Sequence, residues 1–80
     1  MSPVEIHQKL RDVFRDVFDD PLLEITDSTT AADVEDWDSL THINLIVAAE
    51  KTYAVSFTTK EVKALSNVGD FIRLIASRAK

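Results

Sequence analysis

The first part of the chain combines a helix start signal with apolar residues at helical spacing. Ser2 is a typical N-cap residue, Pro3 suits the first helical position, and Glu5 stands where a capping box needs an acid. The Asp19-Asp20-Pro21 segment predicts the end of this helix, because a residue that precedes proline is disfavoured in the helical conformation. We therefore predict a helix over residues 3–18, with an apolar face formed by Val4, Ile6, Leu10, Val13, Phe14, Val17 and Phe18.

A second helical pattern begins near the middle of the chain. Asp36, Asp38 and Ser39 are residue types that cap helices. This predicts a helix over residues 39–53, with Ser39 at its amino-terminal end. Backbone N–H groups there have no intrahelical acceptors and the helix dipole is positive, so an anionic group on the serine oxygen would be stabilised by about 0.3–1 kcal/mol. The apolar residues at helical spacing are Leu40, Ile43, Ile46, Val47 and Tyr53.

Two further helices are predicted in the last third of the chain. Thr58 or Thr59 can cap a brief helix over residues 59–64, and Ser66 or Asn67 can cap a final helix over residues 67–79. Gly69 within the final helix costs about 0.8–1 kcal/mol relative to alanine. Residues 54–57 are predicted to be a loop, because nothing nearby could pair with them as a strand. The final helix has one apolar face, formed by Val68, Phe71, Ile72, Ile75 and Ala79.

Residues 19–38 show no sustained periodicity. A connection that long is uncommon in a compact domain unless it is functional or packed, and we expect it to be packed. The predicted fold is all-α: a small antiparallel helical bundle of three main helices plus one short helix, forming a single domain over residues 1–80. Four apolar residues of the long loop are spaced to close the open edge of this bundle: Leu22, Leu23, Ile25 and Val34.

The amino-acid composition excludes cysteine-based stabilisation, and the chain shows no pattern of a membrane span or a secretory signal. The chain has no cysteine, so neither a disulfide nor a thiolate metal site can stabilise the small core that 80 residues allow. Its longest apolar run, from Leu45 to Ala49, is far shorter than the roughly 20 residues of a membrane span. The amino-terminal residues lack the basic and apolar regions of a secretory signal. We expect a freestanding, cytoplasmic, monomeric protein.

The negative charge of the chain is concentrated in one region. The net charge is −5, and the stretch from Asp16 to Glu50 contains ten acidic residues and no lysine or arginine. Such a field repels nucleic acid and anionic lipid, and it would steer a partner with a basic patch toward Ser39. The same acids could simply keep a small protein in solution, and the two interpretations are compatible.

Two other site chemistries are disfavoured. Asp33, Glu35 and Asp36 resemble calcium ligands, but the residues that follow do not supply the alternating oxygen ligands and the glycine of an EF-hand loop. Ser39 and His42 could form part of a hydrolase site, yet the chain has no G-x-S-x-G turn and no glycine-built oxyanion site.

The two histidines are also weak candidates for a metal site. His7 and His42 lie on separate predicted helices, and no third nitrogen or sulfur ligand accompanies them, so we interpret both as surface groups.

Ser39 itself has two interpretations. A serine before an apolar helical run is usually an N-cap. However, Asp38-Ser39-Leu40, followed by Ile43, Leu45, Ile46, Val47 and Glu50, resembles the signature of acyl carrier proteins, whose motif serine is esterified with 4'-phosphopantetheine. The likeness continues through Val55, Phe57, Leu65, Val68 and Ile72 to Ile75, so it covers nearly the whole chain.

The resemblance implies a carrier and not an enzyme. A separate phosphopantetheinyl transferase would move the arm from coenzyme A onto Ser39, and acyl-loading and acyl-processing enzymes with basic patches would then bind the carrier. Asp38 would help the transferase to engage the motif. The resemblance and the charge pattern together give the expected partner-recognition residues: Asp36, Asp38, Leu40, Ile43, Val47 and Glu50.

Some side chains keep two expected roles. Ile43 and Val47 could equally belong to the core, and Trp37 could either lean over the base of the arm or close the core. An acyl chain would, by family analogy, lie among the helices. The expected walls of its pocket are Leu45, Ile46, Ala49, Phe57, Val62 and Leu65.

Departures from the family pattern bear on the pathway. Many fatty-acid carriers have acids along this helix where this chain has Thr41 and Asn44, which favours a specialised carrier with few partners. The expected pathway is fatty-acid, polyketide or related specialised biosynthesis. Peptide-synthetase carriers typically have glycines before the serine, whereas this chain has Glu35-Asp36-Trp37, which favours the acyl branch. An aminoacyl or peptidyl carrier is the alternative. A helical interaction module with an unmodified serine is the competing class.

Overall fold

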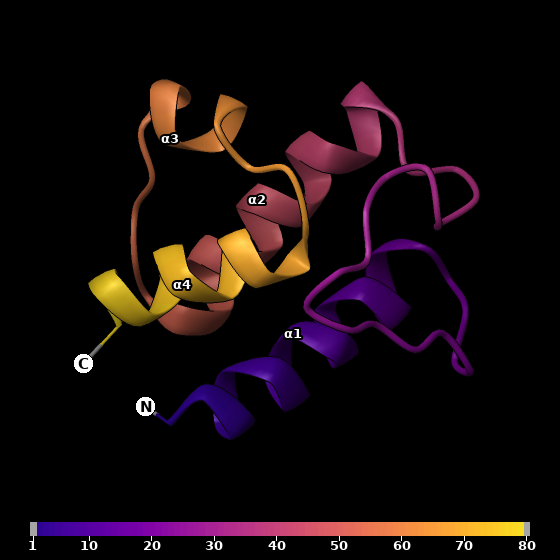
Figure 1. Ribbon diagram of the computed structural model, residues 1–80, viewed down its shortest axis with the longest axis horizontal. Helices are drawn as coiled ribbons and strands as arrows, with labels where there is room; N and C mark the ends of the chain where they lie inside the picture. The colour runs from indigo at the N-terminus through magenta and orange to yellow at the C-terminus, as the bar shows by residue number, and fades with distance from the viewer. Residues whose placement is uncertain (1, 80) are drawn as a thin grey trace.

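A computed structural model describes residues 2–79 as four helices. They are α1 (Pro3–Val17), α2 (Ser39–Tyr53), the short α3 (Thr59–Lys63) and α4 (Val68–Arg78) (Figure 1). No strand occurs within these residues, so the all-α prediction is confirmed, and no predicted helix end differs from the observed one by more than one residue. In the described part of the chain, no helix has both the length and the apolar character needed to span a membrane.

Helix α1 packs against both α2 and α4 and forms the base of the bundle (Figure 1). Ser2 caps it by accepting a hydrogen bond from the backbone N–H of Glu5, as the sequence predicts. Val4 was expected on the apolar face, and this is wrong: its side chain is 65% exposed. At about 100° per residue, Val4 projects nearly opposite to Ile6, so it cannot share the buried face. The buried residues of α1 are Ile6, Leu10, Val13 and Phe14.

Helices α2 and α4 complete the buried core around α1. Tyr53, the last residue of α2, reaches across the core, and its hydroxyl donates a 2.7 Å hydrogen bond to the carbonyl of Ile6. This bond satisfies the polar end of a side chain that is otherwise buried. Further core residues come from α2 and α4: Leu45, Ile46, Ala49, Val68, Phe71, Ile72 and Ile75.

The loop between α1 and α2 is packed, as expected, but not through all four predicted residues. Ile25 and Val34 are buried and Leu23 is half-buried. Leu22 is 84% exposed, so its assignment to the bundle edge is wrong. The backbone N–H of Leu22 bonds to the carboxylate of Asp20 in a tight turn, and this turn directs its side chain outward.

Two contacts anchor this loop to the helices. Nε2 of His7 lies 2.8 Å from the carbonyl of Ile25, and the His7 side chain is half-buried. His7 is therefore not the surface group that we predicted. The backbone N–H of Gly69, in the first turn of α4, donates to the carbonyl of Asp27 at 2.8 Å. The loop is therefore fixed at both its α1 and its α4 sides.

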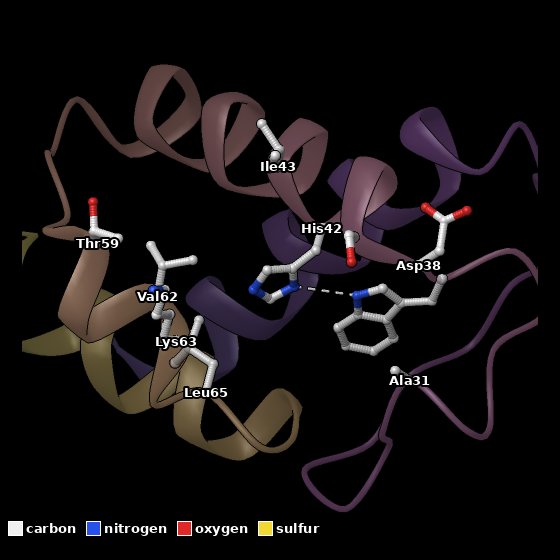
Figure 2. A pocket seen from close by; sticks show the side chains of 10 residues that line it. Ala31, Asp38, His42, Ile43, Thr59, Val62, Lys63 and Leu65 are labelled. Carbon is white, nitrogen blue, oxygen red and sulfur yellow. Dashed lines mark hydrogen bonds between the residues drawn. The ribbon is translucent and has the colours of Figure 1, made fainter.

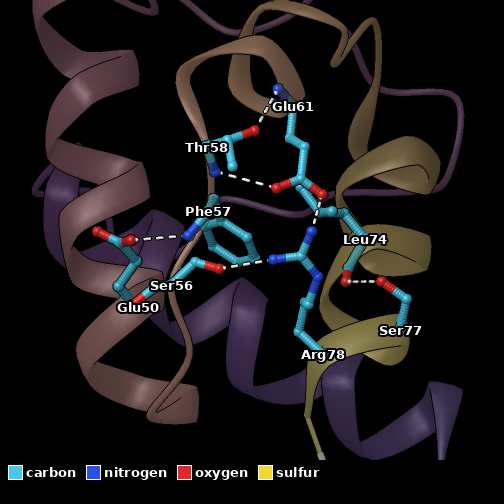
Figure 3. A network of polar contacts seen from close by, with 8 residues as sticks. All are labelled: Glu50, Ser56, Phe57, Thr58, Glu61, Leu74, Ser77 and Arg78. Atoms are coloured by element: carbon cyan, nitrogen blue, oxygen red, sulfur yellow. Dashed lines mark hydrogen bonds and ion pairs between the residues drawn. The ribbon is translucent and has the colours of Figure 1, made fainter.

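A polar network holds α3 against the end of α4 (Figure 3). Thr58 and Glu61 form a capping box at the start of α3, in which each side chain accepts the other residue's backbone N–H. Arg78 in the last turn of α4 donates to the carbonyl of Ser56 at 2.9 Å and pairs with Glu61. The position of α3 thus depends on a side chain from the far end of the chain.

Candidate functional site

Ser39 is the first residue of α2, and its side chain is exposed. Asp38 is the N-cap: its carboxylate accepts the backbone N–H of Thr41 at 3.0 Å. Thr41 returns the contact, because its hydroxyl oxygen accepts the backbone N–H of Asp38 at 2.8 Å. Asp38, and not Ser39, therefore performs the capping, and this leaves the Ser39 hydroxyl available for another role.

The capping hydrogen bonds also keep the Asp38 carboxylate charged at the amino-terminal end of α2. The hydrogen bond from the backbone N–H of Thr41 lowers the pKa of Asp38, because that bond stabilises the carboxylate. Asp38 is therefore ionised at neutral pH, directly beside Ser39.

The residue before Trp37 turns the chain into the site. Asp36 has a positive φ of 70°, an uncommon conformation for a residue other than glycine. Its carbonyl accepts a 2.8 Å hydrogen bond from the hydroxyl of Thr41, and its side chain remains exposed. This turn directs the half-buried Trp37 toward the core while Asp38 remains at the surface.

Trp37 contributes both to the core and to the site. Its ring meets Phe14 edge-on at 5.2 Å, so it closes one end of the bundle. Its indole N–H donates to Nδ1 of His42 at 3.2 Å, and the two rings lie edge to edge, with centroids 6.2 Å apart and 20° between their planes (Figure 2). His42 is thus half-buried and hydrogen-bonded, which corrects its interpretation as a surface group.

An open hollow of about 660 Å³ lies between the start of α2 and α3, beside Ser39 (Figure 2). Two of the six residues expected around an acyl chain, Val62 and Leu65, line it. The sequence analysis did not assign His42, Thr59 or Lys63 to this site, although the position of His42 one helical turn after Ser39 was a usable signal. The other lining residues are Ala31, Trp37, Asp38, Ser39, His42, Ile43, Thr59 and Lys63.

The remaining four expected pocket residues lie elsewhere. Leu45, Ile46 and Ala49 are buried on the side of α2 that belongs to the core cluster. Phe57 is half-buried and meets Phe71 edge-on at 6.1 Å. These four side chains are packed and do not border the hollow.

An apolar stripe, formed by Leu40, Ile43 and Val47, lies on the outer side of α2. Their exposed fractions are 68%, 58% and 44%, so the structure decides against a core role for Ile43 and Val47. Exposed apolar residues at this spacing on one helix form a surface that suits docking into a groove.

Glu50 is less available than the other expected recognition residues. It is half-buried, and its carboxylate accepts the backbone N–H of Phe57 at 2.9 Å (Figure 3). Its contact in the structure is with the loop that leads to α3.

The chain resembles known proteins over nearly its whole length. Residues 8–75 match the family described as phosphopantetheine attachment site. An acyl carrier protein from Acidothermus cellulolyticus is 32% identical over 77 residues, which cover 96% of this chain and 92% of that protein. The solution NMR structure of the holo acyl carrier protein from Geobacter metallireducens superposes with a TM-score of 0.86 at 41% identity, covering 91% of this chain and 84% of that one.

Proposed function

The chain belongs to the acyl carrier protein family, and from this premise we propose that Ser39 is the residue to which its 4'-phosphopantetheine arm is attached. Members of this family are carriers and not enzymes. The observation that supports Ser39 is its exposed position at the first residue of α2, next to an N-cap that leaves its hydroxyl free. The aspartate-serine-leucine sequence of the motif stands at this same place.

The surroundings of Ser39 fit a phosphodiester. A phosphate on the Ser39 oxygen would lie at the positive end of the α2 dipole, near N–H groups of the first turn. The adjacent hollow is open, so a long arm can leave the serine without a clash. When bound, the arm supplies a terminal thiol that holds an acyl group as a thioester.

Partners in this family include a phosphopantetheinyl transferase and the biosynthetic enzymes that use the carrier. We propose that these partners contact the apolar stripe of Leu40, Ile43 and Val47. The exposed acids Asp36 and Asp38, at the start of α2, would attract a basic patch on the partner. The apolar stripe would provide the buried contact area. The acids would orient the partner and raise the rate at which it associates.

We further propose that the cargo belongs to fatty-acid, polyketide or related specialised biosynthesis. Thr41 takes part in the capping box and Asn44 is exposed. Because both side chains are uncharged, this part of α2 presents no charge to a partner. A restricted partner set follows from this. Asn44→Glu should change loading or transfer by some partner enzymes, and an unchanged profile across several of them would contradict the restriction.

We propose an acyl cargo, with an aminoacyl or peptidyl cargo as the alternative. Val62 and Leu65 offer apolar contacts beside Ser39, which favours an acyl group. We also propose that residues 1–80 act as one carrier domain, that the protein is a monomer, and that it works in the cytoplasm.

The attachment is tested by intact mass after incubation with coenzyme A and a promiscuous phosphopantetheinyl transferase. Wild type should gain the mass of one phosphopantetheine group, and Ser39→Ala should gain none. Ser66→Ala, which removes another exposed serine, should still be modified. No gain in wild type would favour an interaction module with an unmodified serine, and modification of Ser39→Ala would place the arm elsewhere.

A further inference from the structure

The contact between Trp37 and His42 fixes which ring nitrogen of the histidine carries its proton. The indole nitrogen of tryptophan is a donor only, so Nδ1 of His42 must accept the 3.2 Å hydrogen bond. In the neutral ring, Nε2 then carries the hydrogen. The two rings are nearly coplanar, with 20° between their planes and 6.2 Å between their centroids, as expected for a hydrogen bond between ring nitrogens.

The Nε2–H group of His42 lies on the wall of the hollow beside Ser39. Figure 2 shows this nitrogen on the side of the His42 ring opposite the dashed hydrogen bond, facing the α3 residue Val62. Within residues 2–79, the structure shows no protein acceptor bonded to it. A donor that is fixed in direction and has no protein acceptor is suited to a ligand in the hollow.

The prosthetic arm matches this wall chemically. Beyond its phosphate, the pantetheine segment carries a geminal dimethyl group, a hydroxyl and two amide carbonyls. Ser39 and His42 are one helical turn apart, so an arm on Ser39 begins at the edge of the hollow. Val62 and Leu65 offer apolar contacts for the methyl groups, and Nε2–H offers a donor for an oxygen.

We propose that His42 is a positioning residue for the arm: its Nε2–H, held in place by Trp37, donates a hydrogen bond to a pantetheine oxygen in the hollow between α2 and α3. This inference rests on the proposed attachment at Ser39. It assigns Trp37 an indirect role, because the indole acts on the arm only through the histidine. The arm would then lie partly along the protein surface until a partner enzyme draws it out.

The first test uses the unmodified protein and does not depend on attachment. In ¹⁵N NMR at a pH where His42 is neutral, its Nε2 should show the protonated signature and its Nδ1 the unprotonated one. Trp37→Phe keeps an aromatic ring against Phe14 but removes the donor, and it should give a mixture of the two tautomers. A wild-type ring protonated on Nδ1, or an unchanged tautomer in Trp37→Phe, would overturn the proposal.

The second test compares unmodified and modified protein after intact mass has verified one arm per chain. In wild type, the arm should shift the NMR signals of the Val62 and Leu65 methyl groups and of His42 Nε2. His42→Phe keeps a ring beside Trp37 and should lose most of the methyl shifts. Thr52→Ala, on the same helix but beside a different hollow, should keep them.

The outcomes separate the two proposals. A chain that gains no arm would refute the attachment before any shift is measured. A chain that gains the arm but shows shifts only next to Ser39, or equal methyl shifts in wild type and His42→Phe, would refute the docking alone.

Discussion

The backbone N–H of Gly69 donates a 2.8 Å hydrogen bond to the carbonyl of Asp27, and this contact fastens the long loop to the first turn of α4. A Cβ atom at position 69 would lie 3.0 Å from that carbonyl oxygen and 3.2 Å from the Asp27 Cβ. The glycine therefore permits a close approach between two backbones, which offsets its cost within a helix.

We expect Gly69→Ala to destabilise the protein. The gain in helix propensity is about 1 kcal/mol, and the overpacking cost is about 1–3 kcal/mol, so the free energy of unfolding should fall by up to about 2 kcal/mol. Urea unfolding measures this change. Ala76→Gly, at an exposed site of α4, measures the difference in helix propensity between alanine and glycine without a change in packing. If Gly69→Ala were more stable by the full propensity gain, the long loop at Asp27 would be able to move away from the added Cβ atom without an energetic cost.

Ala54→Gly should stabilise the protein. Ala54 ends α2 in the left-handed conformation, with φ 55° and ψ 48°, where a Cβ atom is strained and glycine is preferred. Because the side chain is exposed, no packing is lost, and the free energy of unfolding should rise by about 0.5–1 kcal/mol.

The matched control for this change is Ala64→Gly. Ala64 caps α3 with a right-handed φ of −79°, so glycine brings no relief there and should lower stability. Equal effects at the two positions would rule out the strain at Ala54.

Tyr53→Phe should lower the free energy of unfolding by about 0.5–1.5 kcal/mol, because it removes the buried hydrogen bond to the Ile6 carbonyl. The variant should also change the response to alkali. Burial raises the pKa of the Tyr53 hydroxyl, and the negative charge of Asp12 adds to this effect. The raised pKa favours the neutral phenol in the folded state, so wild type should lose stability as the pH rises above about 10, the unfolded value.

Urea unfolding between neutral pH and pH 11 tests both statements about Tyr53. The difference in stability between wild type and Tyr53→Phe should shrink as the pH rises. A constant difference would show that the hydroxyl does not titrate with unfolding.

Asp38→Asn should flatten the response of the protein to acid. The pKa of Asp38 is lowered in the folded state, so its ionised form stabilises the protein above the unfolded pKa, and this stability is lost as the pH falls below about 4. Asparagine keeps the cap but does not titrate. Thermal unfolding from pH 7 to pH 3 should show a smaller loss in Asp38→Asn than in wild type, and parallel curves would contradict the assignment.

Arg78→Gln should loosen α3. The change removes the ion pair with Glu61 and the hydrogen bond to the Ser56 carbonyl that hold α3 to α4 (Figure 3). Amide hydrogen exchange in residues 59–63 should become faster, while exchange in α1 stays unchanged. Arg73→Gln removes an ion pair within α4, with Asp70, and should leave α3 unaffected. Equal exchange in the two variants would show that Arg78 does not hold α3.

The residues around the hollow beside Ser39 could be predicted from the sequence only in part. The position of Ser39 at the start of a helix followed from capping residues and apolar spacing, which are properties of neighbouring positions. His42 was assigned to the surface, because the sequence contains no sign that Trp37, five positions earlier, would fold back to reach its ring. The hydrogen bond between Trp37 and His42 was missed for that reason.

The sequence by itself determined the four helices and the placement of the motif serine, since helical periodicity and capping act over a few residues. It left open which residue caps each of the last three helices, and the structure assigns Asp38, Thr58 and Asn67. It could not decide that Gly69 admits the Asp27 backbone, or that Ile43 and Val47 lie outside the core. Those outcomes depend on how α1, α2, α4 and the long loop pack, because burial is decided by contacts between segments distant in the chain. The tertiary structure alone brings Trp37, His42 and α3 together around the serine.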